Sequence, residues 1–530
     1  MPVPIALSST IAATASLADF AFQLQQRHDS QTTAEERKSR GHFGTPPAVA
    51  RLMADLFPTF PQRSIRLLDP GAGVGTLTAA LCDRFLKLKT PRQIHVEVWE
   101  NDPTLVPLLI ETLERCRISL RSAGHVFEFT VQIGDFVLSH AGESLFDDAT
   151  VPQFDLCVMN PPYFKLRKES PHARAFPHVV HGQPNIYALF MAIAAERLKP
   201  GGSLVAITPR SYFNGPYFRR FRKWFFERMS LRHVHVFESR SDAFRDDQVL
   251  QENVVVHAER SRLTTPITVT STFGREDRCA TKIRLNYAEV VDDTGRDMIV
   301  RVATTTEEQE LLRSVDALPH RLRQHGLEIS TGPVVAFRAT EHLLHERDGH
   351  ASAPLLWMHN VRPSVTTFPA TKNGKPGHVR ISRVSRAILL PAKRYVLMKR
   401  FTAKEEKRRL VAGVMEPGDS YSEFVGLENH LNYVHRPGGE LSRQEAIGLA
   451  AILNSNAIDR YFRAVSGNTQ VNAAEIRNLP LPSLTVIERL GDLVCTIGVE
   501  NADEVEKTVC ASLRLPQKSL APTPLAAGRS

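Results

Sequence analysis

One short segment in the first half of the chain carries side chains suited to holding an amino group. Asn160, Pro161, Pro162 and Tyr163 directly follow the apolar run 154–159, which is typical of a buried strand. The two prolines remove two N–H donors, so the asparagine amide oxygen and the backbone carbonyls remain as acceptors. The aromatic ring alongside can stack on a planar base.

Those acceptors define the chemistry that the segment could perform. An amine attached to a ring or a carbonyl is a poor nucleophile because its lone pair is delocalised. Two acceptors that hold its hydrogens pull the nitrogen toward tetrahedral geometry and localise the pair. We therefore expect a site that acts on an NH2 group, and the alternative is an ordinary proline loop.

A Gly-rich turn lies upstream, in the sequence LLDPGAGVGT at residues 67–76. Its glycines would let a ligand approach the backbone, and the following helix would offer unpaired N–H groups to an anionic group. This pattern predicts a nucleotide-type site that includes Asp69, Gly71 and Gly73. A tight turn between a strand and a helix is the alternative interpretation.

Two acidic positions follow the next two predicted strands. Glu100 ends the second strand, 25 residues after Gly75, where a carboxylate can accept both hydroxyls of a ribose; Asp102 is a possible substitute. Asp135 could accept from an adenine amino group while Phe136 covers the ring. The alternatives are a solvated acid at a strand end and a turn aspartate beside a core phenylalanine.

In this order, the segments resemble the S-adenosylmethionine-dependent DNA methyltransferases that act on the exocyclic amine of adenine. Upstream, residues 41–47 (GHFGTPP) look like the segment that contacts the methionine part of the cofactor in that family. The long variable region after the motifs is similar to the gamma arrangement found in bacterial type II restriction–modification enzymes. The family often has an aromatic pair before its Thr-Pro, and the Phe43-Gly44 of this chain departs from that pattern.

The resemblance implies a role for each matching residue, with S-adenosylmethionine as methyl donor and no metal. The cofactor residues would be Thr45, Asp69 and Gly71 at the methionine end, Gly73 in the turn, Glu100 at the ribose, and Asp135 and Phe136 at the adenine. The catalytic residues would be Asn160 and Pro161, which hold the target amine, with Pro162, Tyr163 on the target ring and Phe244 against the flipped base.

The elements that must position these residues alternate between strands and helices. Strand-like runs at 65–68, 95–99, 127–133, 154–159 and 203–208 alternate with helical patterns at 77–88, 105–118 and 186–198. Such alternation predicts a parallel sheet covered on both faces. The resemblance narrows the fold class to α/β, a class I methyltransferase with a Rossmann-like, mostly parallel seven-stranded sheet, followed by an α+β target-recognition domain.

The pattern changes after about residue 260, where strands become irregular until a helical element returns at 443–464. We therefore expect four parts. They are an N-terminal extension at 1–34, a catalytic domain at 35–265, a target-recognition domain at 266–510 and a disordered tail at 511–530.

The second half is expected to bind DNA, because swinging a base out of a duplex costs a few kcal/mol and requires a firm hold on the flanking strands. A basic stretch at 393–409 could contact phosphates through Lys399, Arg400, Lys407 and Arg408. A solvated basic face is the alternative. The amides of the stretch 466–472 could read base edges, or the stretch could be a structural junction.

Composition supports the same class of protein. The chain has a formal net charge of +9 and 42% hydrophobic residues, which excludes collagen-like and disordered chains. Its six scattered cysteines include no CxxC pair, which indicates a reduced, cytosolic protein without a cysteine zinc site. No apolar run reaches the roughly 18–20 residues that cross a bilayer.

We therefore expect a cytoplasmic, monomeric enzyme of bacterial type that methylates one adenine in a specific duplex sequence. It would protect host DNA from a separate restriction endonuclease. The alternatives keep the chemistry but change the substrate to adenine in RNA or a glutamine amide in a protein. A further alternative is a DNA-specificity protein with a catalytically silent core.

Overall fold

The computed structural model describes residues 16–32, 44–141, 153–237, 253–272, 281–292, 297–347, 349, 351–370, 374–402, 406, 408–419, 422–466 and 470–516. The chain forms two compact units, residues 1–304 and 305–530. Each unit is described by itself.

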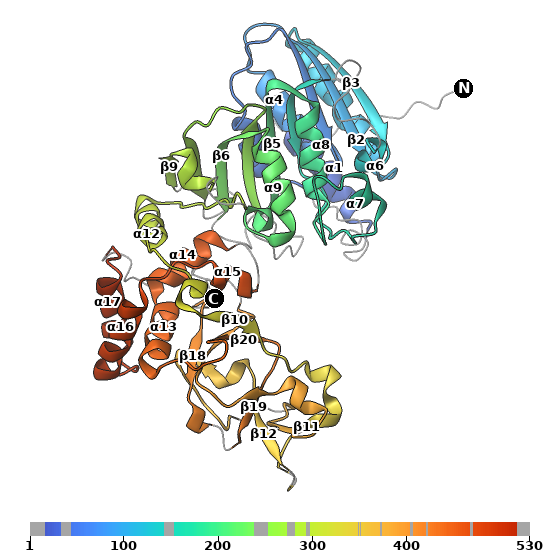
Figure 1. Ribbon diagram of the computed structural model, residues 1–530. Helices are drawn as coiled ribbons and strands as arrows, with labels where there is room; N and C mark the ends of the chain where they lie inside the picture. Colours follow the sequence, from blue (N-terminus) through green and yellow to red (C-terminus); the bar gives the residue numbers. More distant parts are fainter. Residues whose placement is uncertain are drawn as a thin grey trace. The chain divides into compact units, whose positions relative to one another are not determined.

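The first unit is built on one large sheet (Figure 1). Its strands are β1 (Ser64–Pro70), β2 (Gln93–Glu100), β3 (Val126–Ile133), β4 (Phe154–Met159), β5 (Leu198–Pro209), β6 (Ser230–Phe237), β7 (Asn253–Glu259), β8 (Ile267–Thr272) and β9 (Thr281–Leu285). Its helices include α1 (Leu17–Asp29), α3 (Pro47–Asp55), α4 (Thr76–Phe85), α5 (Val106–Ser122), α6 (Phe136–Ser139), α7 (Pro171–Ala175), α8 (Tyr187–Arg197), α9 (Arg219–Phe226) and α11 (Tyr287–Val290).

The sheet order is β3-β2-β1-β4-β5-β7-β6-β8-β9. The pairs from β3 to β5 are parallel, and β7 runs antiparallel to both β5 and β6. This arrangement confirms the predicted class I methyltransferase fold, with β8 and β9 added to the seven expected strands. Because consecutive parallel strands end at one edge, the segments after β1, β2, β3 and β4 are brought together there.

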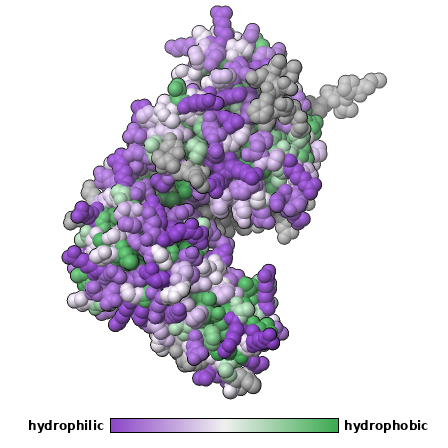
Figure 2. All heavy atoms as spheres, viewed as in Figure 1, coloured by the Kyte–Doolittle hydropathy of each residue, from purple (hydrophilic) through white to green (hydrophobic). Residues whose placement is uncertain are grey.

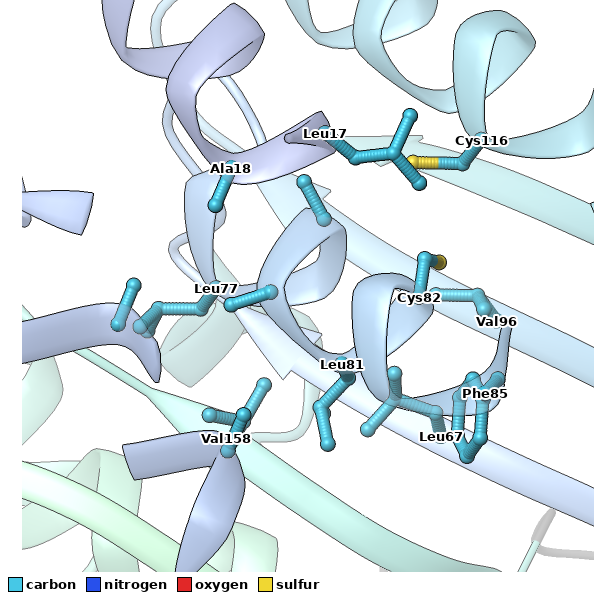
Figure 3. Packing of buried hydrophobic residues seen from close by; sticks show 14 of the residues in the cluster. Leu17, Ala18, Leu67, Leu77, Leu81, Cys82, Phe85, Val96, Cys116 and Val158 are labelled. Carbon is cyan, nitrogen blue, oxygen red and sulfur yellow. The ribbon is translucent and has the colours of Figure 1, made fainter. Parts of the chain in front are cut away.

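The core strands are buried on both faces, as their nearly continuous apolar runs predict. Leu67 and Leu68 of β1 and Val158 of β4 are fully buried. Helix α1 also belongs to this core, because Leu17 and Ala18 pack against α4 and α5 (Figure 3). The backbone N–H groups of these two residues donate to Asp83 at 3.0 and 3.1 Å.

Two predicted boundaries therefore fall inside the first unit. Residues 1–34 were expected to be an extension, yet α1 contributes to the core of the unit. A catalytic domain that ends at 265 would exclude β8, which pairs in parallel with β6 and is continued by β9. Such pairing between strands separated in sequence leaves no local signal.

The second unit contains two small sheets and a group of helices. Its strands are β10 (Glu328–Thr331), β11 (Leu343–Leu344), β12 (Ser352–Leu356), β13 (Val361–Arg362), β14 (Ser364–Thr366), β15 (His378–Arg380), β16 (Leu390–Pro391), β17 (Tyr395–Lys399), β18 (Ala412–Met415), β19 (Phe424–Leu427) and β20 (Leu431–His435). Its helices include α12 (Thr306–Asp316), α13 (Arg443–Asn454), α14 (Asn456–Val465), α15 (Ala473–Arg477), α16 (Leu484–Ile497) and α17 (Ala502–Ser512). The sheet orders are β10-β20-β17-β18-β14-β13 and β11-β15-β12-β19-β16.

The helical pattern predicted at 443–464 is two helices rather than one. Ser455 adopts an extended conformation, and its side chain caps α14 by accepting the N–H of Ile458. At the end of the described chain, Leu513 and Leu515 are buried, so the predicted disordered tail begins too early. Its residues 517–530 lie outside the described residues.

Hydrophilic side chains dominate the visible face (Figure 2). No helix among the described residues is long and apolar enough to span a membrane.

Candidate active site

A pocket opens at the edge where β1, β2, β3 and β4 end. It encloses about 1000 Å³ of empty space, part of which is open to solvent. Eight residues predicted from the sequence line it, namely Thr45, Gly71, Gly73, Glu100, Asp135, Phe136, Asn160 and Pro162. The fold thus gathers most of the predicted cofactor and catalytic residues around one cavity.

The Gly-rich turn has the backbone that its glycines predict. Gly71, Gly73 and Gly75 have φ values of 73°, 57° and 86°, which side-chain-bearing residues rarely adopt. A Cβ at Gly73 would meet no atom within 4 Å, so the space above it belongs to the pocket.

The N–H groups of the turn itself bond within the protein, whereas the sequence prediction concerned the N–H groups at the start of the following helix, α4. Gly71 and Ala72 both donate to the carbonyl of Trp99, and Gly73 donates to Glu100. The turn therefore fixes its own shape and lets a ligand come close.

Glu100 is buried and held by three backbone donors. Its Oε2 accepts the N–H of Gly73 at 2.7 Å, and its Oε1 accepts the N–H groups of Asn101 and Asp102 at 2.8 Å each. The carboxylate is therefore oriented before any ligand arrives and can accept ribose hydroxyls with its remaining lone pairs. Asp102 does not substitute for it, because its Oδ1 instead accepts the N–H and hydroxyl of Thr104.

Asp69 lies beneath the pocket rather than in its lining. Its Oδ2 accepts the hydroxyl of Thr78 at 2.7 Å, whereas its buried Oδ1 has no hydrogen-bond partner among the described residues. Burial, with a smaller contribution from the nearby Glu100, raises the pKa of Asp69 to about 7. A cation bound above it would favour the charged carboxylate.

The predicted adenine end contains a histidine that the sequence did not reveal. Asp135 caps α6 by accepting the N–H groups of Val137 and Leu138, and its other oxygen pairs with Nε2 of His172 at 2.8 Å. The buried ring of Phe136 lies 5.2 Å from that of Phe190, another lining residue. His172 and Phe190 lie more than 30 residues further along the chain, so only folding brings them here.

Asn160 connects the pocket to the segment that follows β4. Its Nδ2 donates to Oγ1 of Thr45 at 3.0 Å, and its Oδ1 accepts the hydroxyl of Tyr163 at 2.7 Å. The same hydroxyl lies 3.1 Å from the carbonyl of Ile207. Burial raises the pKa of Tyr163 far above its ordinary value, so the hydroxyl stays protonated. Each end of the amide thus has a hydroxyl partner that holds it in place.

The aromatic residue that lines the pocket beside this segment is Phe164, not Tyr163. Phe164 is 43% exposed, so a ligand can reach its ring. Pro161 is buried next to the site. Phe244, the expected partner of the flipped base, lies outside the described residues.

These residues fit an adenosyl ligand with positive charge. Glu100 and the unpaired oxygen of Asp69 supply negative charge, the opening above Gly73 permits close approach, and Phe136 supplies an apolar surface for a ring. Among the described residues, no group of three or more His, Cys, Asp and Glu is placed to hold a metal ion.

The residues predicted to contact DNA lie in the second unit. Their role in DNA binding stays a prediction. Lys399 ends β17, and Arg400 after it donates to the carbonyl of Asn429 at 3.2 Å. Its other terminal nitrogen lies 3.5 Å from Oε1 of Gln470. The stretch predicted to contact phosphates and the stretch predicted to read base edges therefore lie side by side. Arg408 is half-buried, and Lys407 lies outside the described residues.

The chain is similar to methyltransferases of restriction-modification systems. The family described as the Eco57I restriction-modification methylase matches residues 125–244. M.PstI, a type II methyltransferase of Providencia stuartii, is 34% identical over 492 residues, which cover 92% of this chain and 96% of that protein. M.BsuBI, a type II methyltransferase of Bacillus subtilis, is 33% identical over 477 residues, covering 89% and 93%.

A solved structure shares the fold over nearly the whole chain. It is the type IIL restriction-modification enzyme MmeI, determined in complex with DNA. The match has a TM-score of 0.54 at 10% identity and covers 95% of this chain and 75% of that one.

Proposed function

The chain belongs to the type II methyltransferases of restriction–modification systems, and on that basis we propose that it methylates adenine at a specific sequence in duplex DNA. The methyl group would pass from S-adenosylmethionine to the exocyclic amine of a flipped adenine. In the cytoplasm, the modification would protect host DNA from a separate restriction endonuclease. The observation that carries the proposal is the fixed amide of Asn160 at the edge of the cofactor pocket.

Asn160 suits an amine because its Oδ1 is an acceptor at the edge of the pocket. Tyr163 donates to Oδ1 and Thr45 accepts from Nδ2, so both ends of the amide have a partner in this orientation. Oδ1 of Asn160 and the carbonyl of Pro161 would accept the two amine hydrogens. Because these acceptors are already oriented, little reorganisation is needed when the amine is bound.

The charges around the pocket suit a sulfonium cofactor. When bound, S-adenosylmethionine supplies an electrophilic methyl group. Glu100 would hold the ribose, Asp135 and Phe136 would hold the adenine, and the buried Asp69 would balance positive charge near Gly71. No strong base is required, since the proton can leave after the nitrogen becomes cationic.

A basic region in the second unit supports duplex DNA as the partner. Residues 332–400 contain twelve Lys and Arg against three Asp and Glu, an excess equal to the net charge of the whole chain. In contrast, the helical part at 443–512 contains nine acidic and six basic residues. We assign the phosphate contacts to the basic region 332–400, because neutralising phosphates releases counterions and drives binding.

The test is to incubate the purified protein with radiolabelled S-adenosylmethionine and either plasmid DNA, RNA or a protein mixture. We expect label in DNA, recovered after digestion as methyladenine, and no label with the Asn160→Ala variant. Label in cytosine would overturn the adenine assignment alone. Label only in RNA or protein would overturn DNA as the substrate.

A further inference from the structure

Gln25 lines the cofactor pocket although it lies outside every motif and within the segment expected to be an extension. It occupies the third turn of α1 and is only 7% exposed. A buried amide in a ligand pocket must satisfy both its donor and its acceptor. Its partners therefore indicate what it could bind.

The side chain fills the space beside Gly44. A Cβ at Gly44 would lie 2.9 Å from Cγ of Gln25 and 3.4 Å from its Cδ, so a side chain at position 44 would displace the glutamine. This packing accounts for the glycine that stands before Thr45, where the resembling family often has an aromatic residue. The side chain of Gln25 thus packs directly against Gly44.

The amide is held with its oxygen available. Its Nε2 donates to Oδ1 of Asp29, one turn later in α1, at 2.8 Å. Within the described part of the chain, no hydrogen bond is made to its Oε1. The helix cannot easily shift, because Asp83 holds its first N–H groups and His28 lies 3.3 Å from the hydroxyl of Thr104.

The position of Gln25 identifies which part of the ligand it would meet. The methyl group must reach the amine at Asn160, and Asn160 is bonded to Thr45, which follows Gly44 directly. The adenosine part is expected at Glu100 and Asp135. The amino-acid arm is then left for the end of the pocket that Gly44, Thr45 and Gln25 share.

We propose that Gln25 binds the amino-acid arm of the methyl donor, with its Oε1 accepting a hydrogen bond from the ammonium group. Helix α1 is therefore part of the cofactor site. The inference rests on the proposed function, in that it takes the ligand to be S-adenosylmethionine.

The test compares two ligands on one variant of the full-length protein by calorimetry. S-adenosylhomocysteine carries the amino-acid arm, whereas methylthioadenosine lacks it. Gln25→Met keeps the length and packing of the side chain but removes the acceptor. Gln26→Ala is the matched control, since its neighbouring side chain is exposed on the same helix.

We expect Gln25→Met to weaken S-adenosylhomocysteine binding about tenfold and methylthioadenosine binding less than twofold. The control should change neither. Because both affinities are measured on the same folded protein, their ratio is insensitive to partial unfolding of the variant.

Two outcomes would overturn the inference. Equal losses for the two ligands would show that Gln25 only packs, and no loss for either would show that it makes no contact. If the wild-type protein bound neither ligand, the proposed function would fail together with this inference.

Discussion

The proposed cofactor pocket and the proposed DNA-binding region 332–400 differ in how a residue acquires its role. Eight of the pocket residues were predicted from sequence, whereas only residues 393–400 of the basic region belong to the basic stretch predicted at 393–409. In the pocket, a role depends on one atom in one place. Asn160 Oδ1, Glu100 Oε2 and Asp135 Oδ2 each have a defined partner. In the basic region, the role belongs to a charge excess that no single residue carries.

The difference is visible in what the charged groups contact. Arg394 in the basic region pairs with Glu416 at 2.8 Å, and Arg400 donates to a backbone carbonyl, so some of its cations serve the fold. Others, such as Arg338 and Arg383, are exposed. Substitutions should therefore have large, specific effects in the pocket and small, additive effects in the basic region.

The largest effect is expected from Asn160→Ala, which should lower the rate of methyl transfer about a thousandfold. The substitution removes an oriented acceptor that is needed only when the amine reacts. S-adenosylhomocysteine affinity should stay within about threefold, measured by calorimetry beside single-turnover rates. A loss confined to cofactor binding would contradict the assigned role.

Asp69→Asn should alter the pH dependence of stability in the ligand-free protein. Because burial raises the pKa of Asp69 to about 7, the folded state binds a proton that the unfolded state has released between about pH 4 and pH 7. The wild-type protein should therefore lose stability as the pH rises through this window, by about 3 kcal/mol relative to the variant.

Chemical unfolding of both proteins at pH 5 and pH 8 measures this difference. Parallel changes in the two proteins would mean that Asp69 keeps an ordinary pKa. A saturating amount of S-adenosylmethionine should reduce the difference, since its positive charge favours the ionised carboxylate.

Glu100→Gln should weaken cofactor binding about tenfold. The carboxylate accepts from Gly73, Asn101 and Asp102, and an amide in its place puts a donor where an acceptor is required. Glu128→Gln on the neighbouring strand β3 is the control, because that side chain is largely exposed. Equal affinities for the two variants would remove Glu100 from the site.

The smallest effect should come from the basic region. Arg338→Ala combined with Arg383→Ala should weaken binding of duplex DNA about fivefold at physiological salt and lower the salt slope by about two. Arg489→Ala in α16 should leave both unchanged, since that arginine is exposed in the acidic helical part. Fluorescence anisotropy over a range of salt concentrations measures both the affinity and the salt slope. If Arg489→Ala weakened DNA binding as much as the double variant, the DNA-binding surface would not be confined to the basic region.

The sequence by itself determined the parts of the site that lie next to strand ends. A buried strand ends where its apolar run ends, so Asp69, Glu100, Asp135 and Asn160 could each be placed after a strand. Once those strands are parallel neighbours, their ends share one edge, and the residues after them must meet. The local sequence pattern and the sheet topology together are therefore enough to place these four residues at one edge of the sheet.

Only the tertiary structure decided which side chains complete the pocket from a distance. Gln25, His172 and Phe190 reach it from helices whose own sequences give no sign of a ligand. The structure also showed that the hydroxyl of Tyr163 orients Asn160, and that β8 extends the sheet beyond the predicted boundary. Contacts of this kind depend on how separate elements pack, and that packing is set by the whole core rather than by any segment of the chain.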